Sequence, residues 1–117
     1  MTDPIGRDLA RQGRVAWLTT RGHRTGLARG VAVGFVMEPD GSLLVAANGP
    51  DQAWGMNLTA DPHLTVEIGD DHYDAVAEPL ERADHVRAVR ELILRYGTPS
   101  EGLGSGPSFR LRRVRSA

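Results

Sequence analysis

Residues 63–79 read HLTVEIGDDHYDAVAEP. In the first half of this stretch large apolar residues alternate with polar ones, which is the pattern of a strand with one buried face. The residues GDD at 69–71 are a turn signal, and the polar run from His72 to Pro79 predicts a second strand, close to a sheet edge, that returns beside the first. The stretch therefore predicts an antiparallel meander, around which the rest of the chain can be interpreted.

The flanking sequence predicts more strands of the same sheet. In residues 28–38 large apolar side chains at Val31, Val33, Phe35 and Met37 alternate with small ones, and the turn signal PDG at 39–41 makes this stretch the first arm of a hairpin. A face that is kept small leaves room for a neighbouring element or a flat ligand. The additional strands are expected at Arg14–Thr20, Ala28–Glu38, Leu43–Asn48 and Ser108–Arg115.

Three helices are expected. The first covers residues 3–12 with Asp3 as its cap, and the second, short one lies between Asp51 and Asp61. The longest covers Glu81–Tyr96 and ends at Gly97, with residues 98–107 as a flexible connection behind it. Its expected apolar stripe, which must cover the sheet, consists of Ala83, Val86, Val89, Ile93 and Tyr96.

The expected fold class is mainly β with α, an antiparallel closed or half-open barrel with one main covering helix. At 117 residues the chain is expected to form one domain, residues 1–117. It has no cysteine, which excludes disulfides and thiolate zinc sites. The amino end lacks the pattern of a signal peptide and no apolar run is long enough to span a bilayer, so we expect no transmembrane segment and a cytoplasmic protein.

The charge is unevenly distributed. All 14 basic residues are arginine, and none lies between Glu38 and Glu81. A basic amino-terminal region beside an acidic middle indicates either an anionic ligand or complementary packing within the protein. Nucleic acid is not an expected partner, because the net charge is -1 and only 5% of the residues are aromatic.

The loop between the first two strands concentrates groups that bind anions. Residues 19–29 read TTRGHRTGLAR, and the two glycines allow tight turns whose amides can face an anion. Arginine and threonine side chains add further donors. The alternative is a solvated hairpin tip, since charged runs are usually solvated.

A second group of residues lies at the end of the strand 43–48. Small residues in AANGP, residues 46–50, would let a planar ring approach the backbone, and Trp54 could form a wall of such a pocket. The alternative is that Trp54 is a core anchor. Asn57 either caps backbone locally or binds a ligand.

No metal site is expected, and no side chain is assigned a catalytic role. The four histidines lie on separate elements without paired ligand spacing, and no triad or phosphate-binding loop motif occurs. The aspartates near His72 are explained by turn geometry. The catalytic residue is left unassigned.

Three ordered motifs resemble a known family. They are LTTRGHRTGLAR at 18–29, VAANGP at 45–50 and AWGMNLTADPHLTVEIG at 53–69. Together they resemble the deazaflavin-dependent nitroreductase family, whose members are split-barrel oxidoreductases of the flavin-reductase and pyridoxamine-phosphate-oxidase type. Agreement of three motifs in order and spacing is far more specific than any one of them.

The resemblance implies an FMN-binding-like split antiparallel β-barrel that binds the anionic deazaflavin coenzyme F-420 and transfers a hydride to an unknown small conjugated or aromatic acceptor. The cofactor supplies the chemistry, so no side-chain acid or base is required. It also implies three groups of cofactor-binding residues. His23, Arg24, Thr25, Gly26 and Arg29 would hold the phosphate and the glutamate tail, Ala46, Ala47 and Asn48 would line the ring, and Trp54 and Asn57 would brace its edge.

Two alternatives remain at this stage. One is a protein that binds this cofactor, or a lipid or haem-like ligand, without turnover. The other is a split-barrel oxidoreductase that uses FMN, although a single phosphate would need fewer arginines than the loop at 21–29 carries. The sequence leaves the substrate, the redox direction and the formation of a homodimer undecided.

Overall fold

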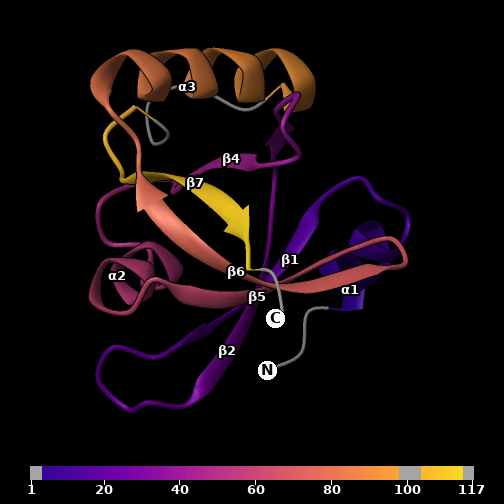
Figure 1. Ribbon diagram of the computed structural model, residues 1–117, viewed down its shortest axis with the longest axis vertical. Helices are drawn as coiled ribbons and strands as arrows, with labels where there is room; N and C mark the ends of the chain where they lie inside the picture. Colours follow the sequence, from indigo (N-terminus) through magenta and orange to yellow (C-terminus); the bar gives the residue numbers. More distant parts are fainter. Residues whose placement is uncertain (1–3, 98–103, 115–117) are drawn as a thin grey trace.

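The computed structural model describes residues 4–97 and 104–114. It contains a seven-stranded sheet in the order β2-β1-β5-β6-β7-β4-β3, with antiparallel pairing between all neighbours, curled into a half-barrel with three helices around it (Figure 1). The elements are α1 Pro4–Arg11, β1 Ala16–Arg21, β2 Ala28–Val33, β3 Val36–Met37, β4 Leu43–Ala46, α2 Ala53–Ala60, β5 His63–Ile68, β6 Asp71–Pro79, α3 Arg82–Tyr96 and β7 Ser108–Arg113. The predicted antiparallel barrel architecture is confirmed.

Some predicted features lie outside the described residues. They are the helix cap Asp3, the larger part of the connection 98–107, and the last residue of the strand Ser108–Arg115.

The meander of β5 and β6 follows the alternation in the sequence, but the expected edge position of the second strand is wrong, because β6 is paired on both sides, with β5 and with β7. Its register runs from His63 opposite Val76 to Ile68 opposite Asp71, and the turn passes through Gly69 with φ of 58°. The expected alternation holds, because Leu64 and Val66 are buried while His63 is exposed.

The predicted strand 28–38 is wrong as a single element, because the chain turns a corner at Gly34 and Phe35. The hydroxyl of Tyr96 accepts a hydrogen bond from the Phe35 N–H at 3.1 Å, and a Cβ on Gly34 would lie 2.8 Å from the Tyr96 ring. The alternation of faces continues past the corner, since Phe35 belongs to the larger core and Val36 to the core under α3. The expected inward position of Met37 is wrong, because Met37 lies on β3, the outermost strand of the sheet, and is 57% exposed.

The sheet has one core on each face. The larger core includes residues of α2 and of every strand except β3, and the smaller one lies between β4 and α3, which crosses the top of the molecule in Figure 1. All four residues of β4 are buried because Leu43 and Val45 face the first core while Leu44 and Ala46 face the second. The larger core consists of Ala16, Leu18, Val33, Phe35, Leu43, Val45, Ala47, Trp54, Leu58, Leu64, Val66, Ala75, Ala77, Phe109 and Leu111.

The apolar stripe predicted for α3 is partly wrong. The most buried residues of the helix are Ala88 and Leu92, four residues apart, whereas Val86 is 52% exposed. Compared with the expected orientation, the helix is rotated toward the side that carries Arg87. Arg87 Nη2 forms an ion pair with Glu38 Oε1, just beyond β3, at a distance of 2.5 Å. Its predicted end is confirmed, since Gly97 adopts the left-handed conformation and donates its N–H to the Ile93 carbonyl.

Candidate functional site

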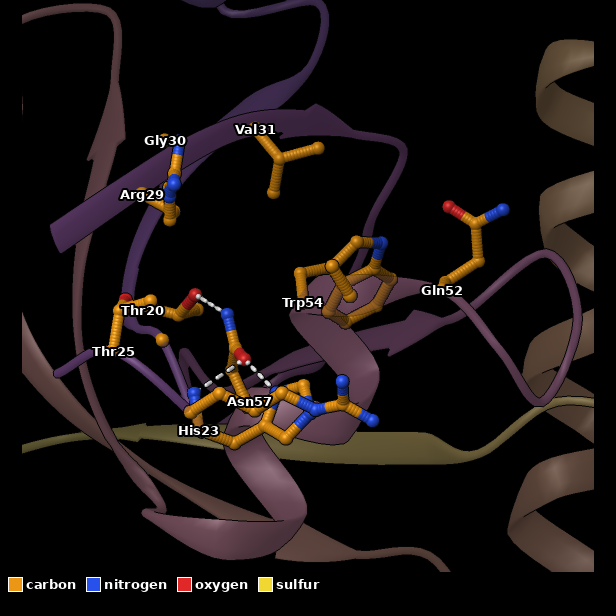
Figure 2. A pocket seen from close by; sticks show the side chains of 12 residues that line it. Thr20, His23, Thr25, Arg29, Gly30, Val31, Gln52, Trp54 and Asn57 are labelled. Carbon is orange, nitrogen blue, oxygen red and sulfur yellow. Dashed lines mark hydrogen bonds between the residues drawn. The ribbon is translucent and has the colours of Figure 1, made fainter. Parts of the chain in front are cut away.

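A pocket of about 450 Å³ lies between the β1–β2 loop, β2 and the start of α2 (Figure 2). It brings together the predicted loop 19–29 and the two other residues of the second predicted group, Trp54 and Asn57, whereas none of residues 46–50 lines it. Its lining residues are Thr20, Gly22, His23, Arg24, Thr25, Arg29, Gly30, Val31, Gln52, Ala53, Trp54 and Asn57.

The side chain of Asn57 ties the two motifs together. It is only 2% exposed, and its Oδ1 accepts hydrogen bonds from the His23 main-chain N–H at 2.9 Å and from His23 Nδ1 at 2.7 Å. Its Nδ2 donates to Thr20 Oγ1 at 3.0 Å. Figure 2 shows these bonds joining the helix to the loop and to the end of β1. Both polar atoms of this buried amide are thus bonded locally, which fixes the loop against α2.

The loop itself is held by its own backbone. Gly26, with φ of 73°, donates its N–H to the Gly22 carbonyl at 2.8 Å and accepts from Arg21 Nη1 at 2.9 Å. The N–H of Gly22 is bonded to the Leu27 carbonyl, and that of Leu27 to Thr25 Oγ1. Because these amides are occupied, an anion at this loop depends on side chains more than on the backbone donors that the glycine pattern indicated.

Two guanidinium groups of the pocket have no acidic partner. Within the part of the chain that the structure describes, Arg24 and Arg29 make no ion pair. By contrast, Arg87 and Arg110 are both paired with Glu38. Unpaired guanidinium groups in a pocket provide charge-assisted donors for phosphate or carboxylate.

One wall of the pocket is apolar. Val31 of β2 and the ring of Trp54 face the hollow in Figure 2. Trp54 is only 7% exposed and its ring lies 6.3 Å from that of Phe109, so it is both a core anchor and a part of this wall. The pocket thus combines a flat apolar surface with a cationic rim, which suits a planar ring that carries an anionic chain.

Four of the residues predicted to bind the cofactor do not line this pocket. Gly26 is bonded within the loop through its N–H, which donates to the Gly22 carbonyl. Asn48 is exposed just beyond the end of β4. Ala46 and Ala47 are buried in the two cores, and the N–H of Ala47 donates to the Pro107 carbonyl at 2.8 Å. Contact of these four residues with a cofactor remains a prediction.

Six lining residues were not predicted. Thr20 and Gly22 lie within the loop motif, and Gln52 and Ala53 directly precede Trp54, so their neighbourhood was a usable signal. Gly30 and Val31 belong to β2. Their exposure to the pocket depends on the position of β2 relative to the start of α2, which local patterning does not encode.

The remaining titratable clusters have structural explanations. Asp61 accepts hydrogen bonds from the His63 ring at 2.9 Å and from the His63 N–H at 3.1 Å, and these bonds lower the pKa of the carboxyl at the end of α2.

No group of three or more metal-ligating side chains occurs among residues 4–97 and 104–114. None of the described helices is long and apolar enough to cross a membrane.

Comparison with solved structures places this architecture among split barrels. The F420-H2 dependent reductase FDR-A is 25% identical, with a TM-score of 0.70 over 85% of this chain and 94% of that chain. A candidate pyridoxamine 5'-phosphate oxidase from Listeria innocua is 16% identical, with a TM-score of 0.69 over 93% of this chain and 90% of that chain. The heme storage protein HutZ of Vibrio cholerae is 20% identical, with a TM-score of 0.66 over 97% and 91%. At these lower identities the last two likenesses concern the fold alone.

The sequence itself gives the family. No protein of curated function matches it. The sequence model of the F420H(2)-dependent quinone reductases matches residues 2–99, which span both motifs of the pocket. The deazaflavin resemblance is therefore confirmed at the level of F420-dependent reductases. The chain belongs to the F420H(2)-dependent quinone reductase family, and is thus an oxidoreductase whose cofactor is the deazaflavin coenzyme F420.

Proposed function

We propose that the pocket between the β1–β2 loop and α2 holds F420, and that the protein uses the reduced cofactor to reduce a small conjugated acceptor such as a quinone. The observation that carries this assignment is the pair of unpaired arginines, Arg24 and Arg29, on the rim of a pocket with an apolar wall. The polyanionic tail of F420 matches the rim, and its planar ring matches the wall.

Each part of the pocket has a defined task in this proposal. Arg24 and Arg29 bind the phosphate and carboxylate groups, with Thr25 as a neutral donor beside them. Val31 and Trp54 hold the ring flat and exclude water from one of its faces. When bound, the cofactor supplies a hydride, and the protein contributes position and desolvation. A conjugated acceptor is the matching substrate class because it can stack on a flat ring and take up a hydride.

A fluorescence titration tests the cofactor site. The wild-type protein is titrated with F420 and, separately, with FMN, and is compared with the double variant Arg24→Ala/Arg29→Ala. Loss of two charge-assisted contacts should weaken F420 binding about 100-fold or more. Arg90→Ala is the matched control, since Arg90 lies on α3 away from the pocket and makes no ion pair among the described residues. F420 binding that is indifferent to the double substitution would contradict the site assignment.

The acceptor is tested separately by turnover. Oxidation of reduced F420 is followed by absorbance with a water-soluble benzoquinone, a naphthoquinone and a nitroaromatic compound as alternative acceptors. We expect the wild-type protein and the Arg90→Ala variant to turn over a quinone. At limiting cofactor concentration the double variant should lose this activity. Binding of F420 without turnover of any of the three acceptors would instead favour a cofactor carrier.

A further inference from the structure

The solvent side of α3 is apolar and basic. The exposed residues of this helix include no acid, and they are Arg82, Ala83, Val86, Arg90, Leu94 and Arg95. Leu94 is 79% exposed, more than any other large apolar residue in the described part of the chain, and Val86 is 52% exposed. Exposed apolar side chains that gather on one element, with charges beside them, are typical of an interaction surface.

A groove runs along the same side of the helix. It has a volume of about 420 Å³ and is lined by Arg82, His85, Val86, Val89, Arg90, Ile93, Leu94 and Gly104. Because its α3 residues are spaced three or four apart, they form one continuous stripe. The carbonyl of Gly104 lies 3.2 Å from His85 Nε2, which holds the segment at Gly104 beside the helix. The two acids of α3, Asp84 and Glu91, do not line the groove.

The two arginines of this groove have no acidic partner. Among residues 4–97 and 104–114, neither Arg82 nor Arg90 forms an ion pair, whereas Arg87 of the same helix is paired with Glu38. Unpaired guanidinium groups attract phosphate, and their long side chains let apolar neighbours enter an apolar phase while the charge stays in water. The stripe therefore matches the boundary between phosphate groups and acyl chains in an anionic lipid surface.

We propose that α3 is a docking surface through which the protein binds anionic membranes peripherally. Val86 and Leu94 enter the upper part of the acyl chains. Arg82 and Arg90 bind the lipid phosphate groups. The shape of the molecule supports this, because α3 is the outermost element at the top of Figure 1 and a flat surface can contact it along its length. A second copy of the chain is a poorer match, since a twofold contact would place this basic groove against an identical groove without acids.

This proposal does not depend on the cofactor assignment. The β1–β2 loop and β2, which line the pocket assigned to F420, lie at the bottom of Figure 1, opposite α3. A protein docked through α3 thus keeps this pocket in water, away from the lipid charges. Repulsion between those charges and the anionic cofactor is screened over such a separation.

Cosedimentation with vesicles tests the docking. We expect binding to vesicles of equal parts phosphatidylglycerol and phosphatidylcholine, weakened by salt, and none to phosphatidylcholine alone. Arg82→Ala/Arg90→Ala should weaken the binding about tenfold or more, and Val86→Gln/Leu94→Gln should do the same. Both pairs have exposed or partly exposed side chains on the helix surface, so both variants should fold.

The matched control removes the same charge from the opposite side of the molecule. Arg24→Ala/Arg29→Ala should leave vesicle binding unchanged, because these arginines belong to the other pocket. Absence of binding to the anionic vesicles, or binding that the α3 substitutions do not weaken, would overturn the proposal. An equal loss in the two arginine variants would overturn it as well, since it would indicate attraction by net charge alone. Arg82→Ala/Arg90→Ala should still bind F420 as the wild type does, so failure of either assignment leaves the other testable.

A fluorescent label tests the orientation directly. The chain has no cysteine, so a single introduced cysteine can carry an environment-sensitive fluorophore. Leu94→Cys places it on α3, and Leu27→Cys, also at an exposed leucine, places it in the β1–β2 loop. With the anionic vesicles we expect a blue-shifted, stronger emission from the label on α3 and no change from the label in the loop. Equal responses would overturn the orientation. A response on α3 that arises without vesicles, as the protein concentration rises, would show that a second copy covers the stripe and would overturn the proposal.

Discussion

Gly30 shows how a single residue connects the pocket to the packing behind it. It lines the pocket, and the Trp17 ring of the neighbouring strand lies directly against its Cα, so that a Cβ at this position would overlap the indole. At Gly30, the small residues expected on one face of this strand are thus explained by packing against Trp17 of the same sheet. Trp17 is in turn covered by the guanidinium of Arg7, 4.8 Å from the ring centre.

Substitution of Gly30 should therefore destabilise the protein. Gly30→Ala forces the buried Trp17 ring out of place, and we expect a loss of about 1–3 kcal/mol in the free energy of unfolding, measured by urea denaturation. Ala28→Ser is the matched control on the same strand, because Ala28 is exposed and should tolerate the change within about 0.5 kcal/mol. Equal stability of Gly30→Ala and wild type would contradict the packing described for Trp17.

The hydroxyl of Tyr96 gives a second prediction for one residue. It donates to the Arg14 carbonyl at 2.9 Å and accepts from the Phe35 N–H at 3.1 Å. Tyr96→Phe removes this partner from the partly buried Phe35 N–H and from the exposed Arg14 carbonyl, so we expect a loss of about 1–2 kcal/mol in thermal or urea unfolding. Tyr73→Phe is the control, since no described residue bonds the Tyr73 hydroxyl. A larger loss in the Tyr73 variant would refute this explanation of the corner.

At the scale of elements, one carboxylate joins β3, α3 and β7. Glu38, just beyond β3, accepts from Arg87 of α3 at 2.5 Å and from Arg110 of β7 at 3.4 Å. The hydrogen bond from Arg87 is the main cause of the lowered pKa of this carboxyl, which is only 12% exposed. The network thus ties α3 to β7 and to the end of β3.

The lowered pKa of Glu38 determines how its contribution depends on pH. A carboxyl whose pKa is lowered on folding stabilises the native state above its unfolded-state pKa, and this stabilisation is lost as the pH falls through the folded-state pKa. Glu38→Gln should therefore cost about 1–3 kcal/mol in unfolding free energy near pH 7, and the difference from wild type should shrink below about pH 4.5. Glu78→Gln, at a half-exposed pair with Arg112, is the control with little effect. A cost for Glu38→Gln that is constant with pH would contradict the ion-pair explanation.

The elements differ in how well the sequence predicted them. The β5–β6 meander and the end of α3 at Gly97 followed from alternation and from a glycine cap, because both signals are local. The corner at Gly34 and the rotation of α3 could not be predicted from local signals. The corner depends on the Tyr96 hydroxyl, which is 61 residues from Phe35 in the sequence. The rotation depends on Glu38, which is 49 residues from Arg87. The pocket was predicted in part. The chemistry of its loop was visible, whereas the burial of Ala46 and Ala47 follows from the chain segment at Pro107.

At the scale of the whole molecule, we propose that residues 1–117 form a single domain. The strands form one continuous sheet, and α2 and α3 pack on its two faces through the two cores. We expect thermal unfolding in one transition, with calorimetric and van't Hoff enthalpies that agree. Two separable transitions, or a van't Hoff enthalpy well below the calorimetric one, would contradict this proposal.

The position of β7 has a consequence for biosynthesis. Although it comes last among the strands in the sequence, β7 lies between β6 and β4, and its Phe109 and Leu111 belong to the larger core (Figure 1). On the ribosome β4 and β6 therefore emerge with no strand between them and with apolar side chains unprotected. Trp54 of the pocket wall packs against Phe109 of β7, so the wall is complete only after β7 has been translated. We therefore expect the nascent chain to bind chaperones until β7 has emerged.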